Sequence, residues 1–220
     1  MKEWNGLPIY IMGSSGTSKE VKSIINDINK KNKTTIYQVC AFVDIKEYNL
    51  VNGLKVINEQ QFFEETEEHL VFGVVIPFGI PILKVNLYDK VKHLKNVVFP
   101  NIIHPSVTIG ENVEMGKGNV LAAGATISPN VTIGNFCLIN NNCNIGHDSV
   151  IEDFVVINPL SAVSGNVSVR QGAQLGGHSA VLQGVEVGEY SQVGLGAFLI
   201  KNLPKNEIAI CEPAKMRPKK

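Results

Sequence analysis

The chain has 220 residues, and its 20 basic and 20 acidic side chains cancel to a formal net charge of zero. This balance offers no basic surface for DNA or RNA, so we expect no nucleic-acid partner. No apolar segment reaches the roughly 18 residues of a membrane span, and the first residues lack a signal peptide's apolar core, which predicts a cytoplasmic protein without a membrane span.

The first hundred residues alternate β-rich segments with segments that can be helical. Strands are predicted at 9–12, 35–43, 69–76 and 96–99, and helices at 18–30 and 82–93. Such alternation is typical of a small open parallel α/β sheet. We therefore expect a Rossmann-like domain over residues 1–100.

A glycine-serine loop, GSSGTSKE at 13–20, joins the first predicted strand to the first predicted helix. Helix amino-termini hold phosphate through free N–H groups, and the loop glycines permit close approach. Thr17 and Glu20 are predicted to form a capping box. The GxxG spacing is neither the GxGxxG dinucleotide fingerprint nor a Walker A loop, so a phosphate site and a plain tight turn both stay open.

From Ile103 to Leu199, an aliphatic or methionine side chain occupies every sixth position, seventeen times in succession. A second column of mostly small side chains lies four residues after each of these positions. Glycine follows the aliphatic residue directly at 110, 116, 134, 146, 176, 188 and 194, where we expect corners with unusual dihedral angles. A fixed short period of this kind is typical of a β-solenoid.

This run resembles the hexapeptide repeat of the left-handed β-helix acyltransferases. The resemblance implies a left-handed parallel β-helix over residues 101–220, with three hexapeptides per coil, and assembly as a homotrimer. Because exposed strand edges need protection, we expect the amino-terminal domain to cover one end of the prism and the tail to cover the other.

Further motifs narrow the resemblance. The GxxG loop is followed by NIIHPSVTIG, GHDSVIEDF, SAVSGNV and EPAK, in the order seen in nucleotide-sugar acetyltransferases. That group contains bacillosamine and perosamine N-acetyltransferases and sialic acid O-acetyltransferases. The resemblance implies acetyl-CoA-dependent acetylation of the 4-amino group of a nucleotide-linked amino-dideoxy sugar, as in surface polysaccharide biosynthesis. The alternative is O-acetylation of sialic acid or another free sugar.

The resemblance makes His147 the general base and Asp148 the acid that orients its imidazole. A neutral imidazole that accepts the proton of an attacking amine typically contributes about 10²- to 10⁴-fold. Adjacent residues do not normally point the same way, so this pairing requires a coil corner or a neighbouring subunit. An exposed and inert turn histidine is the alternative.

The resemblance also implies an acetyl-CoA site in the groove between adjacent prisms. Gly165, Gly177 and Leu195 match donor-contacting positions of the family. Basic residues at 215–220 could reach the coenzyme A phosphates, although we favour a solvated tail. Neither Cys137 nor Cys143 matches a known nucleophile position, so we expect direct transfer.

Acceptor contacts follow from the same family. Ser15, Gly16 and Thr17 match loop positions that contact the sugar nucleotide, and Asp44 matches an acidic residue that faces the base or ribose. Thr17 and Val156 stand where relatives often have histidines. The sequence leaves the choice among UDP, GDP and dTDP open.

Two other solenoid classes stay open. A γ-carbonic anhydrase-type enzyme needs three imidazoles around zinc, whereas His147 and His178 lie far apart in the sequence, so we predict no metal site. The four cysteines form no CxxC pair, which favours small apolar fillers over metal ligands. A purely structural solenoid would not bind coenzyme A.

Overall fold

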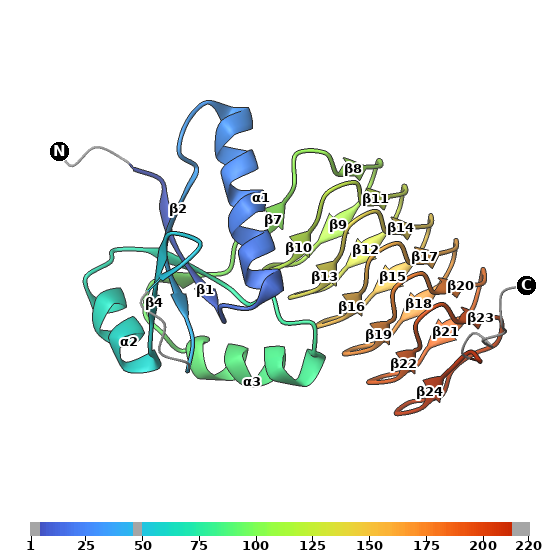
Figure 1. Ribbon diagram of the computed structural model, residues 1–220. Helices are drawn as coiled ribbons and strands as arrows, with labels where there is room; N and C mark the ends of the chain where they lie inside the picture. The colour runs from blue at the N-terminus through green and yellow to red at the C-terminus, as the bar shows by residue number, and fades with distance from the viewer. Residues whose placement is uncertain (1–4, 46–49, 213–220) are drawn as a thin grey trace, which may run out of the picture.

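The computed structural model, whose described residues are 5–45 and 50–212, contains an α/β domain followed by a prism of stacked coils (Figure 1). The domain comprises β1 (Leu7–Met12), α1 (Gly16–Asn32), β2 (Tyr37–Val43), β3 (Leu50–Val51), β4 (Leu54–Ile57), α2 (Glu59–Glu67), β5 (Phe72–Val75), α3 (Pro81–Val91) and β6 (Val97–Val98). The strand order is β3-β4-β2-β1-β5-β6, and every pair except the β3–β4 hairpin is parallel. The predicted Rossmann-like α/β class is therefore confirmed.

Three elements between residues 50 and 67 are not among those predicted. Helix α2 has only two buried side chains, Phe62 and Thr66, so its sequence carries little apolar periodicity. A capping box does occur here: Asn58 Oδ1 accepts from Gln61 N at 2.9 Å, and Gln61 Oε1 accepts from Asn58 N at 3.0 Å.

The prism has three faces of parallel two-residue strands. Face I comprises β7 (Ile102–Ile103), β10 (Val120–Leu121), β13 (Leu138–Ile139), β16 (Val156–Ile157), β19 (Gln174–Leu175), β22 (Gln192–Val193) and β24 (Ile208–Ala209). Face II comprises β8 (Thr108–Ile109), β11 (Thr126–Ile127), β14 (Asn144–Ile145), β17 (Ala162–Val163), β20 (Ala180–Val181) and β23 (Phe198–Leu199). Face III comprises β9 (Glu114–Met115), β12 (Thr132–Ile133), β15 (Val150–Ile151), β18 (Ser168–Val169) and β21 (Glu186–Val187).

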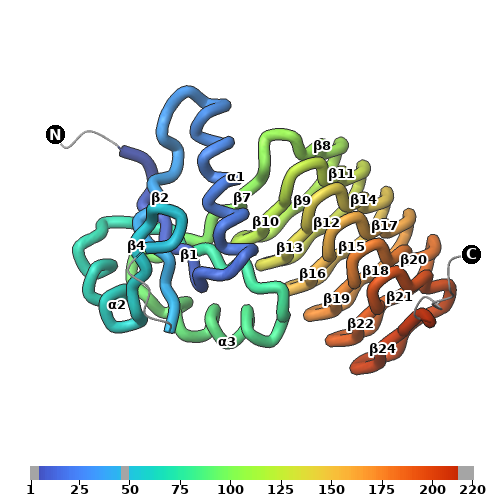
Figure 2. The backbone as a smooth tube through the Cα atoms, in the orientation of Figure 1, coloured from blue at the N-terminus to red at the C-terminus, as the bar shows by residue number. Residues whose placement is uncertain are grey.

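Each strand pairs with the strand eighteen residues later, as Leu121 does with Ile139, which makes one coil of three hexapeptides. The second residue of each strand points inward, and the sixth-position column from Leu121 to Val193 is buried throughout. The left-handed β-helix is thus confirmed, and the smooth tube of Figure 2 shows its coils stacked in register. Only the last coil is shorter, because Ala209 pairs with Val193, sixteen residues earlier.

The amino-terminal domain packs along face I, so the expectation that it covers the end of the prism is wrong. Outward-facing Ile102, Val120, Ala122, Leu138 and Val156 form one apolar cluster with Val21, Ile24 and Ile25 of α1. These apolar residues on the outside of the coils form the surface that α1 buries. Ile109, in the first coil, is 44% exposed, so the domain does not cover the prism there. The α/β domain is therefore joined to the prism through a seam along its side, formed by α1 and face I, and not by a cap over its end.

The glycines that follow the aliphatic column serve close packing, so the expectation of unusual dihedral angles there is wrong. Positive φ occurs two residues after each of them, as at Asp148 (φ 59°) after Gly146. A Cβ at Gly146 would lie 2.5 Å from the carbonyl carbon of Ser164 in the next coil. Glycine therefore leaves room for the next coil at these positions, although the equivalent positions one coil before and after Gly146 hold Ser128 and Ser164.

Among the described residues, no helix combines the length and apolar character that a membrane crossing needs.

Candidate active site

The predicted catalytic pair lies at the corner where face II turns into face III. The positive-φ position of this corner recurs every eighteen residues, at Asn112, Asn130, Asp148, Asn166 and Gly184. The left-handed conformation of Asp148 turns its side chain back toward His147, the residue before it. The coil corner therefore explains how adjacent residues can pair within one chain.

A hydrogen bond of 2.7 Å joins His147 Nδ1 to Asp148 Oδ2. Because an ionised carboxylate can only accept, Nδ1 carries the proton and Nε2 keeps a free lone pair. Asp148 Oδ1 accepts a second hydrogen bond, of 3.0 Å, from Asn130 Nδ2. Hydrogen bonds from His147 and Asn130 hold the pKa of Asp148 below its usual value. Both members of the pair are open to solvent, with side chains 56% and 45% exposed.

Gly165, in the next coil, lies directly against the imidazole. A Cβ there would be 2.6 Å from both Cε1 and Nε2 of His147. The Asn166 N–H also donates to the His147 carbonyl at 2.8 Å. The structure thus brings the predicted donor contact Gly165 to the predicted base, and the absent side chain leaves room for the ring.

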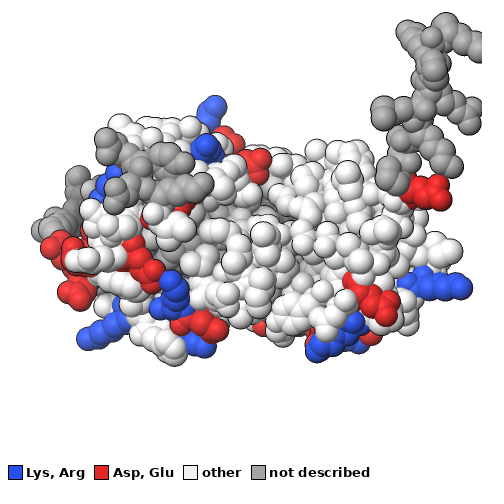
Figure 3. Space-filling view, turned by 60° about the horizontal axis from the view of Figure 1, so that its bottom comes forward, with Lys and Arg blue, Asp and Glu red and all other residues white. Residues whose placement is uncertain are grey.

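The other two predicted donor contacts lie on a different corner, between faces I and II. A Cβ at Gly177 would approach Leu195 Cδ1 to 3.4 Å, and Leu195 is 72% exposed. Face II separates these residues from Gly165, and its later coils expose Leu182, Phe198 and Ile200. On the side of the molecule in Figure 3, charged side chains gather over the α/β domain and near the far end of the prism, with largely uncharged surface between.

The predicted acceptor residues meet at the carboxyl edge of the α/β sheet. Helix α1 begins at Gly16 with Ser15 as its N-cap, so the predicted capping box of Thr17 and Glu20 is wrong. The Ser15 side chain makes no capping bond, which leaves the first-turn N–H groups without that partner.

Asp44, after β2, binds the loop itself. Its Oδ2 accepts from the Ser14 N–H at 2.8 Å and from the Ser14 Oγ at 2.6 Å. Phe78, after β5, packs on the same loop, because a Cβ at Gly13 (φ 80°) would lie 2.9 Å from its ring. From the sequence, Ile76, Pro77 and Phe78 after the third strand were expected to lean on the base, whereas Ser14 was not among the predicted site residues, and its position beside the loop glycines is the only sequence signal for it.

The structure does not bring the loop and His147 together within one chain. Helix α1 covers face I, and the corner of His147 is the one opposite that face (Figure 1). A prism side of about six residues at roughly 3.3 Å each is about 20 Å wide. The width of the prism therefore separates the two sets of residues.

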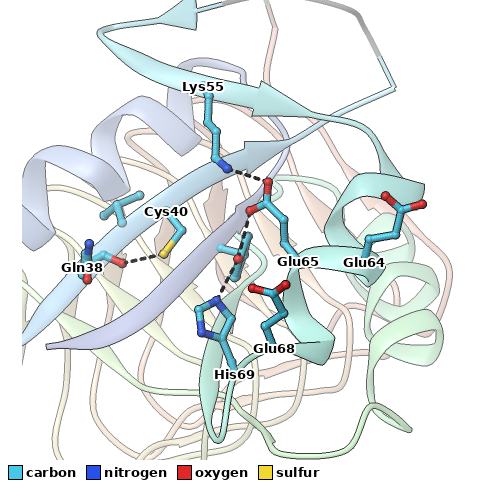
Figure 4. Close-up of a pocket in the computed structure, with 9 residues that line it drawn as sticks. Gln38, Cys40, Lys55, Glu64, Glu65, Glu68 and His69 are labelled. Atoms are coloured by element: carbon cyan, nitrogen blue, oxygen red, sulfur yellow. Dashed lines mark hydrogen bonds and ion pairs between the residues drawn. The ribbon is translucent and has the colours of Figure 1, made fainter. Parts of the chain in front are cut away.

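A separate cavity of about 560 Å³ lies between β1, β2, β4 and α2 (Figure 4). Its polar groups bind one another: Tyr10 Oη lies 3.2 Å from Glu65 and 3.0 Å from His69 Nε2, and Lys55 pairs with Glu65. Burial raises the pKa of Tyr10. No predicted site residue lies here.

Within residues 5–45 and 50–212, no group of three or more His, Cys, Asp or Glu side chains could hold a metal ion. Most of EPAK and the basic tail at 215–220 lie outside the described residues.

Residues 8–91 match the family model of the PglD N-terminal domain. A histidine-to-asparagine variant of perosamine N-acetyltransferase from Caulobacter crescentus, in complex with CoA and GDP-perosamine, is similar across the whole chain. The identity is 27% and the TM-score 0.83, covering 96% of this chain and 97% of that one. The acetyltransferase domain of PglB from Neisseria gonorrhoeae shares the fold at 23% identity and a TM-score of 0.83, covering 94% of this chain and 98% of that one. WeeI from Acinetobacter baumannii also shares the fold, at 23% identity and a TM-score of 0.80, covering 95% of this chain and 99% of that one.

An α/β domain joined to a left-handed β-helix, with an exposed His-Asp pair at a coil corner, defines a hexapeptide-repeat acetyltransferase. Over nearly its whole length the chain is similar to perosamine N-acetyltransferase, and its residues 8–91 match the PglD N-terminal domain family. Its amino-terminal domain is of the PglD type.

Proposed function

We propose that the protein transfers the acetyl group of acetyl-CoA to the 4-amino group of a nucleotide-linked amino-dideoxy sugar. The observation that carries this proposal is the His147–Asp148 pair, held with Nε2 free at an exposed corner. The structural relative that binds CoA and GDP-perosamine supports the donor and the acceptor class. We also expect a cytoplasmic enzyme of surface polysaccharide biosynthesis.

His147 acts as the general base in this proposal. Its Nε2 takes a proton from the sugar amine as the amine nitrogen bonds to the thioester carbonyl carbon. The carbon–sulfur bond then breaks, and the His147 imidazolium returns the proton to the sulfur, so coenzyme A leaves as the thiol. Asp148 stays ionised and stabilises the imidazolium that forms between these steps.

Direct transfer is supported by the state of the interior cysteines. Cys137 and Cys143 lie inside the prism, and burial raises their pKa values to about 12 and about 11. Both are therefore protonated thiols with no route to a thioester at neutral pH. An acyl-enzyme on either one would contradict this geometry.

Acetyl-CoA supplies the activated acetyl group, and the residues of face II fit such a ligand. Gly165 borders this face beside Nε2, while Gly177 and Leu195 border it on the other side. The exposed Leu182, Phe198 and Ile200 between them provide an apolar surface that suits a pantetheine arm and a neighbouring prism.

The separation of the two sets of residues leads us to infer that two chains form one site, which fits the proposed homotrimer. Ser15, Gly16, Thr17 and Asp44 hold the nucleotide sugar on the side of face I, and His147 lies at the opposite corner. We propose that the loop of one subunit presents its sugar to His147 of the next.

The test is thiol release from acetyl-CoA with UDP-, GDP- and dTDP-linked 4-amino sugars and with free sialic acid. Release with one nucleotide-linked amine supports the proposal and identifies the nucleotide. Release with sialic acid alone would replace it with O-acetylation. Silence with every acceptor would reject the acceptor class.

Mixed trimers test the shared site. Gly16→Glu places a carboxylate at the phosphate-facing loop, where a new side chain meets no atom within 4 Å. Co-assembled Gly16→Glu and His147→Ala chains should recover activity that neither has alone, because an intact loop then faces an intact histidine. No recovery would place the whole site within one chain.

A further inference from the structure

A ladder of side-chain amides leads along the corner to the catalytic pair. Asn112 Nδ2 donates to Asn130 Oδ1 at 3.2 Å, and Asn130 Nδ2 donates to Asp148 Oδ1 at 3.0 Å. These residues occupy equivalent positions in consecutive coils, with φ values of 55°, 60° and 59°. The ladder ends at the 2.7 Å hydrogen bond between Asp148 and His147.

The chemistry of Asp148 fixes the direction of these bonds. An ionised carboxylate only accepts, so Asn130 must present its NH₂ group to Asp148 and its carbonyl oxygen to Asn112. Asn112 then donates with its own NH₂ group. The bond from Asn112 holds the carbonyl side of the Asn130 amide on the side away from the carboxylate.

We propose that Asn130 is a positioning residue for acetyl transfer, and that Asn112 orients Asn130. Asn130 occupies Oδ1 of Asp148 and so keeps Oδ2 turned to His147 Nδ1, which directs the Nε2 lone pair outward. This inference rests on the proposed role of His147. The signal in the sequence is the exact coil spacing between Asn130 and Asp148.

The backbone alone does not account for these bonds. Asparagine is favoured at positive φ, and Asn206 adopts φ 60° at the prism's last coil. Within the described residues, however, Asn206 makes no side-chain hydrogen bond to the catalytic pair, which lies several coils away. The positive φ of the corner therefore explains why asparagine suits position 130. The hydrogen bond to Asp148 is a separate property of Asn130.

The pair has few other charged neighbours along the corner. Its own column holds proline at 129, glycine at 165 and glutamine at 183, with Glu111 two coils before His147 and Lys201 three coils after. Faces II and III meet at the corner. The outward residues of face II in adjacent coils are uncharged, and on face III Glu152 is paired with Arg170 at 2.8 Å. A carboxylate introduced at position 130 would therefore be the main new charge that acts on the His147–Asp148 pair.

Asn130→Gly removes the amide and keeps the positive-φ backbone relaxed. We expect kcat to fall roughly tenfold, the effect of about one hydrogen bond, with both KM values unchanged. Asn206→Gly is the matched control and should leave kcat unchanged. An unchanged kcat in Asn130→Gly would overturn the proposal.

Asn130→Asp tests how strongly position 130 is coupled to the catalytic pair. A second carboxylate beside Asp148 favours the protonated imidazolium of His147. The acid limb of the pH profile of kcat/KM should therefore shift upward by about half to one pH unit. Asn112→Asp, one coil or about 4.8 Å further away, should shift it less. Equal shifts, or none, would overturn the proposal.

A titration of ¹³C-labelled histidine by NMR gives the same answer without a substrate, with His147→Ala identifying the His147 signal. The signal's midpoint should move to higher pH in Asn130→Asp and stay in Asn206→Asp. If these shifts appear but His147→Ala keeps full activity, the ladder stands and the proposed base fails. If the midpoint does not move, the positioning role fails on its own.

Discussion

Two corners of the prism have the same backbone and opposite surfaces. The corner of His147 repeats positive φ every eighteen residues, and so does the corner of Phe136 and Phe154. The first carries amides and a carboxylate open to solvent. The second stacks Phe136 on Phe154 at 5.4 Å and closes on Tyr88 of α3, whose ring is 4.6 Å from Phe136. The repeat supplies equivalent positions, and single side chains decide which corner carries the proposed catalytic pair and which one packs against α3.

The largest effect that the comparison predicts is on turnover at the polar corner. His147→Ala should lower kcat about 10²- to 10⁴-fold, because no other group there can take the amine proton. The measurement is steady-state turnover together with the oligomeric state by light scattering, which should not change. His93→Ala, an exposed histidine of the α/β domain, is the control and should keep full turnover. Equal turnover in the two variants would remove the base assignment.

The aromatic corner should respond in stability. Phe136→Ala removes a ring that is 1% exposed and touches Tyr88, Phe99 and Phe154, so it should lower the free energy of unfolding by about 3 to 5 kcal/mol. Chemical denaturation measures this change. Turnover per folded protein should stay within a few-fold of the parent. A hundredfold loss of turnover at unchanged stability would contradict the division between the corners.

The same contrast explains what the sequence could predict. A period of six over seventeen positions predicts a β-solenoid with buried aliphatic columns, and the resemblance to the hexapeptide-repeat family supplied the left-handed, three-sided coil. How the two parts dock does not, because the outward Val120, Leu138 and Val156 read as ordinary strand residues until α1 is seen against them. The capping box failed for a related reason: the helix begins one residue before Thr17, and local spacing does not fix such a boundary.

Site residues divide in the same way. The His-Asp motif pointed to the corner that we propose as catalytic, because adjacent residues with complementary chemistry are visible in the sequence. Asn130 was missed, since its partner lies one coil away and only the eighteen-residue spacing connects them. The separation of the loop from His147 is a property of three dimensions that no linear pattern contains.

A buried charge distinguishes the seam from the solvated corner as well. Lys84 on α3 is 1% exposed, and burial lowers its pKa from 10.5 to about 8. The unfolded chain therefore binds the proton more tightly, so stability increases as pH rises from about 8 to 10.5 and is lower below that window. Lys84→Met should remove this slope and raise the free energy of unfolding at pH 7 by up to about 3 kcal/mol.

Denaturant unfolding of both proteins between pH 7 and pH 10 measures the difference, in which the titration of other groups cancels. The two curves should converge as the pH rises. A parallel offset across this range would show that the Lys84 amine is solvated or paired in solution.

The smallest effect on stability and turnover should come from a change in the cavity beside Tyr10, which contrasts with the open corner of His147. Tyr10 Oη already hydrogen-bonds to Glu65 and to His69 Nε2, so these atoms are engaged before any ligand binds. At the corner, by contrast, Nε2 of His147 makes no hydrogen bond within the described residues. His69→Leu should therefore cost about 1 kcal/mol of stability through the lost Tyr10 bond and change kcat less than twofold. A large fall in turnover would mean that cavity volume, rather than an unsatisfied reactive atom, marks the functional site of this protein.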